Sequence, residues 1–145
     1  MTDDAASAAM LRRYLADQVR TASPAKRLLM LFDQVQRDLA AAESGFASGD
    51  LKEISDSLVH AQQVIIALRD PLDPGTELGR ALRGVYGFCL ERLVEANLRK
   101  DPSLLPDVQV LIGRIAAANR AAMAQRPPVA PGEPASRALE PAHAG

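Results

Sequence analysis

The sequence predicts an all-α protein, an antiparallel up-down four-helix bundle with a short N-terminal helical cap segment. Aromatic residues make up only 3% of the 145 residues, whereas β-sandwiches rely on aromatic and β-branched side chains. The abundant Ala, Leu, Arg and Gln are good helix formers. Four stretches carry apolar residues at three- and four-residue spacing, and the short links between them favour antiparallel packing. We divide the chain into a cap segment (1–22), a bundle (23–125) and a Pro-rich tail (126–145).

The first two helices have clear start and stop signals. Ser23 is a favoured N-cap, and Pro24 suits the first helical position because its missing N–H would be unsatisfied there anyway. Gly45 and Gly49, together with Ser48, mark the end of this helix. The predicted inner face comprises Leu28, Leu31, Phe32, Val35, Leu39, Ala42 and Phe46. The second helix starts near Asp50 and ends before Pro71; its predicted inner face comprises Leu51, Ile54, Leu58, Ala61, Ile65 and Leu68.

The last two helices follow the same logic. The third is expected from Thr76 to Arg99, with an inner stripe of Leu78, Leu82, Val85, Cys89, Leu93 and Ala96. The fourth starts at Asp101, a cap that is followed by a proline. Its inner positions are Leu104 or Leu105, Val108, Leu111 or Ile112, Ile115, Ala118 and Ala122.

The two ends of the chain differ from the bundle. The apolar pattern before residue 23 is too short to form a stable helix alone in water, so it must pack on the bundle or fray. Five of the ten prolines lie in the last twenty residues. Such a composition cannot bury enough apolar surface to offset the entropy of ordering, so we expect residues 126–145 to be disordered.

Composition excludes several classes of function. The net charge of −1 gives no positive field that would attract nucleic acid or an anionic membrane. The sequence contains no run of about 20 apolar residues, so we expect no membrane-spanning helix. The first residues lack the pattern of a secretory signal. A single cysteine rules out an internal disulfide. We therefore expect a reduced, cytoplasmic, soluble protein.

No catalytic or metal-binding constellation is apparent. His60 lies about 200° around its helix from Leu58, which predicts a solvated surface histidine. Cys89 falls on the inner stripe, which predicts a buried thiol rather than a nucleophile. Gly79, Gly84 and Gly87 occupy helical positions, where they allow close approach of another backbone. The sequence therefore predicts a protein that is not an enzyme and that carries no metal and no cofactor.

Some apolar residues exceed what the bundle core requires. Val59 and Ile66 lie about 80–100° off the inner face of the second helix. On the third helix, Tyr86, Leu90, Val94 and Asn97 lie about 40–120° off the inner stripe. On the first helix, Leu29 and Met30 point away from the inner face. Four explanations remain open: loosely buried flank positions, cover for the N-terminal segment, a dimer face, or a groove for an amphipathic partner chain.

Three segments resemble the flagellar secretion chaperone family, FliS. The stretch YLADQVRTASPAKRLLMLFDQV (14–35) is similar to its opening signature, which includes Thr-Ala-Ser-Pro. HAQQVIIALRDPLD (60–73) and VYGFCLERLVEANLRKD (85–101) resemble its later blocks. The likeness spans about residues 12–124. Two departures are Phe32-Asp33-Gln34 in place of Tyr-Asp-Gly, and Pro71 in place of Ser. The Pro-rich tail has no counterpart in the family pattern.

The resemblance implies a cytoplasmic helical chaperone without enzymatic activity or cofactor. Such a protein binds the disordered C-terminal segment of flagellin, prevents premature polymerisation, and escorts flagellin to the type III export apparatus, where a gate component is a further possible partner. Tyr14 and Leu15 match a cap that covers part of the binding surface, and Tyr86, Arg92, Leu93 and Asn97 match the block on the third helix. The candidate partner-binding residues are Tyr14, Leu15, Val59, Ile66, Tyr86, Leu90, Leu93, Val94 and Asn97.

An alternative reading is a structural or regulatory bundle that self-associates. In that case the surplus apolar positions form a homodimer face. The sequence predicts a monomer or a weak homodimer and does not decide between them.

Overall fold

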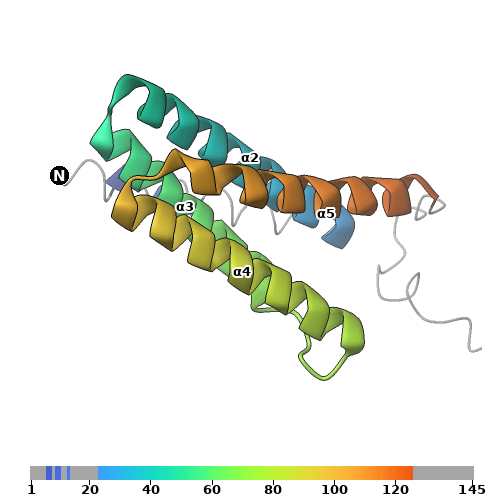
Figure 1. Cartoon of the computed structure of the whole chain (residues 1–145). Helices are drawn as coiled ribbons and strands as arrows, with labels where there is room; N and C mark the ends of the chain where they lie inside the picture. Colours follow the sequence, from blue (N-terminus) through green and yellow to red (C-terminus); the bar gives the residue numbers. More distant parts are fainter. Residues whose placement is uncertain (1–5, 8, 11–12, 14–22, 126–145) are drawn as a thin grey trace, which may run out of the picture.

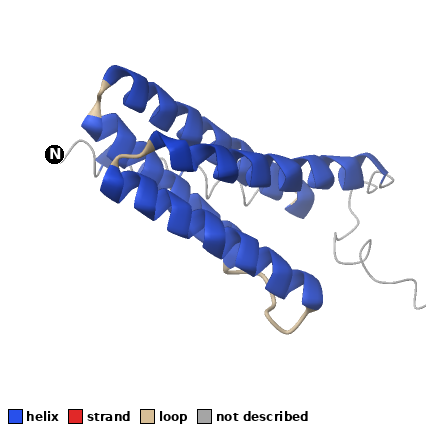
Figure 2. Cartoon of the chain, in the orientation of Figure 1, coloured by secondary structure: helices blue, strands red, loops and turns tan. Residues whose placement is uncertain are grey.

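Four long helices account for most of the chain. The computed structural model describes residues 6, 7, 9, 10, 13 and 23–125. The helices are α2 (Pro24–Ser48), α3 (Leu51–Arg69), α4 (Glu77–Arg99) and α5 (Leu105–Gln125), and a 3₁₀ turn, η1 (Pro102–Leu104), precedes α5. Within these described residues there is no strand (Figure 2). The predicted tail lies outside them, as does most of the predicted cap segment, including Tyr14 and Leu15.

The predicted capping residues start the helices. Ser23 Oγ accepts a hydrogen bond from the Lys26 backbone N–H (3.2 Å), and the Asp50 carboxylate accepts one from that of Glu53 (3.1 Å). Gly49 ends α2 at φ 73°, a conformation that favours glycine. The prediction for the fourth helix was less accurate, because residues 102–104 form a 3₁₀ turn before the α-helix begins.

The helices form an antiparallel bundle (Figure 1). In the order of the chain, α2 packs on α3 and α3 on α4, and α5 closes the arrangement against both α4 and α2. The two links α2–α3 and α4–α5 lie at one end, and the α3–α4 link lies at the other (Figure 1). Across α2 and α5, Arg120 Nη2 lies 2.8 Å from Asp33 Oδ1. The prediction of an all-α bundle is confirmed.

All four helices contribute to one core. Its buried members are Phe32, Val35, Leu39, Ala42, Ile54, Leu58, Ala61, Val64, Ile65, Leu68, Tyr86, Cys89, Leu93, Ala96, Leu105, Val108, Ile112 and Ala116. Leu105 and Ile112 therefore resolve the two alternatives left open on the fourth helix. The prediction was wrong at Leu28, Leu51 and Leu78, which are 37%, 62% and 70% exposed, and at Ala118 and Ala122, which are also exposed. Leu51 and Leu78 lie in the first turns of α3 and α4.

Candidate functional site

Two sets of hydrogen bonds join α3 to α4. Near the start of α3, Ser55 Oγ donates to Asn97 Oδ1 (3.1 Å), and Lys100 Nζ donates both to Ser55 Oγ (3.0 Å) and to Asn97 Oδ1. At the other end, Arg83 Nη1 donates to the carbonyl oxygens of Arg69 (3.1 Å) and Leu72 (3.2 Å). We call these two sets the Asn97 clasp and the Arg83 clasp.

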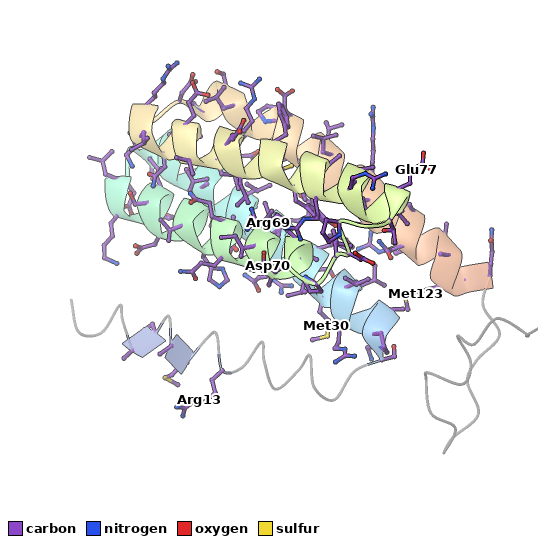
Figure 3. The ribbon with its side chains drawn as sticks, turned by 90° about the horizontal axis from the view of Figure 1, so that it is seen from below. Arg13, Met30, Arg69, Asp70, Glu77 and Met123 are labelled. Carbon is purple, nitrogen blue, oxygen red and sulfur yellow. The ribbon has the colours of Figure 1, made fainter. Side chains whose placement is uncertain are left out.

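The clasps fix how the two helices align. Ser55 lies opposite Asn97, and Arg69 lies beside Arg83, so fourteen residues separate the clasps on each helix. Fourteen residues make about four helical turns, or roughly 21 Å. Figure 3 views α3 and α4 side by side, with Arg69 where α3 meets the loop to α4.

Apolar side chains occupy the flank between the clasps. Val59 and Ile66 follow Ser55 by four and eleven residues, and Leu90 and Val94 follow Arg83 by seven and eleven. These spacings place all four side chains on the same flank as the clasps. Val59, Ile66 and Val94 are 43%, 38% and 42% exposed, and Leu90 is half-buried. We call these four residues the α3–α4 strip.

The strip borders a hollow on α4. Leu90 and Val94 line this open depression of about 450 Å³ together with Glu91, Glu95, Leu98 and Arg99. Leu98 is 81% exposed, the largest exposed fraction among the large apolar residues described. Glu95 pairs with Arg99 across 3.1 Å, which partly neutralises this rim of the hollow. A hollow lined by both apolar and charged side chains suits a partner that buries one face and leaves the other in water.

Two predicted partner-binding residues belong to the core instead. Tyr86 is 3% exposed and Leu93 is fully buried. Burial raises the pKa of Tyr86 to about 12, with a smaller contribution from the neighbouring Cys89. The predicted inner stripe ran through Val85, but the buried face of α4 includes Tyr86, and Val85 is only partly buried. Both residues can support a surface from beneath but do not form it.

Asn97 is part-buried and already engaged. Its side-chain oxygen accepts hydrogen bonds from both Ser55 and Lys100, so the structure gives it a role inside the molecule. Sequence reasoning did not anticipate this role, nor that of Arg83. The hydrogen-bond acceptors of Arg83 are backbone carbonyls, and no side-chain pattern marks such acceptors in a sequence.

His60 contradicts its prediction as a solvated histidine. Its Nδ1 lies 2.6 Å from Asp38 Oδ2 on α2, and its side chain is only 12% exposed. Asp38 Oδ1 also accepts from Gln34 Nε2 (2.9 Å), and Gln34 Oε1 accepts from Arg37 (2.9 Å). The angle from Leu58 placed His60 away from the helix's inner face, but α2 covers that flank of α3.

Cys89 is confirmed as a buried thiol. It is fully buried, and burial raises its pKa to about 11, so it stays protonated at neutral pH and is a poor nucleophile. In the described part of the chain, no three His, Cys, Asp or Glu side chains are grouped to hold a metal ion. None of the described helices has the length and apolar character needed to cross a bilayer.

Comparison with known proteins places these features in a family. The family model described as "Flagellar protein FliS" matches residues 6–126, which include the strip and both clasps. The "Flagellar secretion chaperone FliS" of Bacillus subtilis is 28% identical over 96 residues, covering 66% of this chain and 72% of that protein. The protein of the same name from Salmonella typhimurium is 33% identical over 103 residues (69% and 76%), and that from Escherichia coli is 34% identical over 101 residues (68% and 74%).

These relatives are named as chaperones and not as enzymes. The match extends over most of the chain, and the resemblance first noted in three short segments is confirmed by it. The family match, together with the helical bundle, shows that the chain is a member of the FliS family of flagellar proteins.

Proposed function

We propose that this protein is a cytoplasmic export chaperone that binds the C-terminal segment of flagellin on the α3–α4 strip. In this role it prevents premature polymerisation of flagellin and escorts it to the flagellar type III export apparatus. The observation that carries the proposal is the row of exposed apolar side chains between the two clasps. The relatives' name, flagellar secretion chaperone, supports the export role.

The physical chemistry of the strip favours a helical client segment. The described partner surface consists of helices, whose backbone groups are paired internally, and helical surfaces offer no strand edge to extend. A client that is disordered when free loses chain entropy on binding. Burial of its apolar face offsets this loss by about 25 cal/mol per Å². The resulting moderate affinity suits a cargo that must later be released.

The N-terminal residues complete the proposal. We place Tyr14 and Leu15 in a cap segment (1–22) that covers part of the strip until the client displaces it, and we assign residues 126–145 to a separate tail. Contact with a component of the export gate would follow client binding.

Calorimetric titration with a flagellin C-terminal fragment tests the proposal. We expect Ile66→Asp and Leu90→Asp each to weaken binding at least tenfold, because a carboxylate would be desolvated in the interface. Val110→Asp on α5 is the matched control, since Val110 is also an exposed apolar residue (49%) but lies on another helix. Unchanged affinity in both strip variants would remove the strip from the binding site.

Leu98 favours a second candidate, self-association, because a side chain that is 81% exposed beside the strip suits a dimer face. Sedimentation at several concentrations separates the two. A tight dimer that excludes the flagellin fragment would favour self-association, whereas a monomer that binds the fragment supports the chaperone role.

A further inference from the structure

The Asn97 clasp has an unusual backbone feature. Lys100 ends α4 in the left-handed region at φ 51°, and it is the one non-glycine residue with positive φ in the described part of the chain. Glycine usually occupies such a position because other residues are strained there. Lysine brings an ammonium group that glycine lacks, and this group donates to both Ser55 and Asn97. The side-chain contacts offset the strained backbone conformation.

The clasps add directional contacts to the apolar packing between α3 and α4. The core contacts of α3 and α4 lie on their inner faces, while the strip on their outer flank is exposed. The hydrophobic effect is not directional, whereas hydrogen bonds require defined positions of donor and acceptor. The two clasps pair the stretch of α3 between Ser55 and Arg69 with the stretch of α4 between Arg83 and Asn97, and all four strip residues lie within these two stretches.

We propose that Asn97 and Arg83 are positioning residues for client binding, which hold α3 and α4 in the one alignment that makes the strip continuous. This inference rests on the proposed function. Asn97 acts through its side-chain oxygen on Ser55 and Lys100 and not by touching the client, and Arg83 acts through the α3 end carbonyls. The two clasps also bound the strip, so its continuous part accepts about four turns of a client helix.

Two substitutions of Asn97 distinguish positioning from direct contact. Asn97→Asp keeps the acceptor oxygen used by Ser55 and Lys100 but removes the amide N–H donors that a client could use. We expect Asn97→Asp to bind the flagellin fragment within about twofold of the unaltered chain, and Asn97→Ala to lose about tenfold. Equal losses in both variants would show that Asn97 contacts the client and would overturn the proposal, as would unchanged affinity in Asn97→Ala.

A stability-matched control separates positioning from general destabilisation. Ala117→Gly, at an exposed interior position of α5, lowers stability without altering the strip. We expect Ala117→Gly to leave the affinity for the flagellin fragment unchanged. For the other clasp, we expect Arg83→Gln to weaken binding about fivefold, and Arg114→Gln on α5, its matched control, to leave binding unchanged. If Ala117→Gly weakened binding as much as Asn97→Ala at equal loss of stability, the clasp would have no positioning role.

Hydrogen exchange tests the clasp without the client. We expect Asn97→Ala to speed amide exchange several-fold in residues 59–66 and 87–94 relative to Asn97→Asp. If the unaltered chain failed to bind the flagellin fragment, the proposed function would be wrong. The exchange rates would still show whether the Asn97 clasp holds α3 and α4 in place. Equal amide exchange in Asn97→Ala and Asn97→Asp would contradict the positioning role of Asn97.

Discussion

His60 Nδ1 lies 2.6 Å from Asp38 Oδ2, and this contact joins α3 to α2 through two side chains that are only 12% and 10% exposed. Asp38 also accepts from Gln34, so its carboxylate is the centre of a small polar network beside the core. Polar groups in such a place are stabilising only while each retains its partner.

Removal of the Asp38 carboxylate is therefore expected to destabilise the bundle. Asp38→Ala leaves both His60 and Gln34 without their shared acceptor, and we expect a loss of about 1–3 kcal/mol in the free energy of unfolding, measured by urea denaturation. Asp56→Ala is the matched control, because Asp56 pairs with Lys52 at the surface with 60% of its side chain exposed. That change should cost less than about 1 kcal/mol. Equal losses for the two variants would contradict the structural role of the Asp38–His60 pair.

The helical glycines of α4 should respond in opposite ways to alanine. A Cβ atom on Gly79 would lie 1.9 Å from the Asp73 carbonyl oxygen, so Gly79→Ala should destabilise the α3–α4 link. A Cβ atom on Gly84 would meet nothing within 4 Å, and Gly84→Ala should raise the free energy of unfolding by about 0.5–1 kcal/mol through reduced backbone entropy of the unfolded chain. Thermal unfolding followed by circular dichroism measures both. A stabilising Gly79→Ala would show that the link moves freely.

The helical glycines of α4 also test a prediction made from the sequence. Close approach of another backbone was predicted for Gly79, Gly84 and Gly87. It is confirmed at Gly79, where the α3–α4 link passes, and it is wrong within the described structure for the other two.

The Cys89 thiol gives a prediction for alkaline pH. Its pKa is about 11 in the fold and 9.0 in the absence of burial. The unfolded chain therefore loses this proton first, and stability falls as pH rises from about 9 to about 11. Tyr86 adds a similar fall between about 10 and about 12. We expect the urea midpoint to decrease over this range, with a shallower decrease between pH 9 and 10 in Cys89→Ala. An identical slope in that variant would assign the early fall to other groups.

Local sequence signals determined the helices themselves. Ser23, Asp50 and Thr76 each cap a helix through a side-chain oxygen, and Gly49 ends α2, as the residue types predict. These interactions span three or four residues, so neighbouring sequence contains all that they need. The inner face of α3 was also correct from Ile54 to Leu68, because a regular apolar spacing survives any modest rotation of the helix.

Errors arose where a second helix decides the environment. His60 pairs with Asp38 across twenty-two residues of sequence, and Tyr86 enters the core because α4 is rotated relative to its predicted stripe. Leu78 has the spacing of a core residue but is exposed, because α5 does not cover the start of α4.

By itself, then, the sequence determined that four helices form, where the first three begin and end, and which family the chain resembles. Only the tertiary structure decided which flank of each helix is covered, that Tyr86 and Leu93 are internal, and that Ser55, Asn97 and Lys100 meet. The physical reason is range. Caps and apolar periodicity depend on residues within one or two turns, whereas the alignment of α3 on α4 depends on contacts between residues on different helices, such as Ser55 and Asn97, which are 42 positions apart.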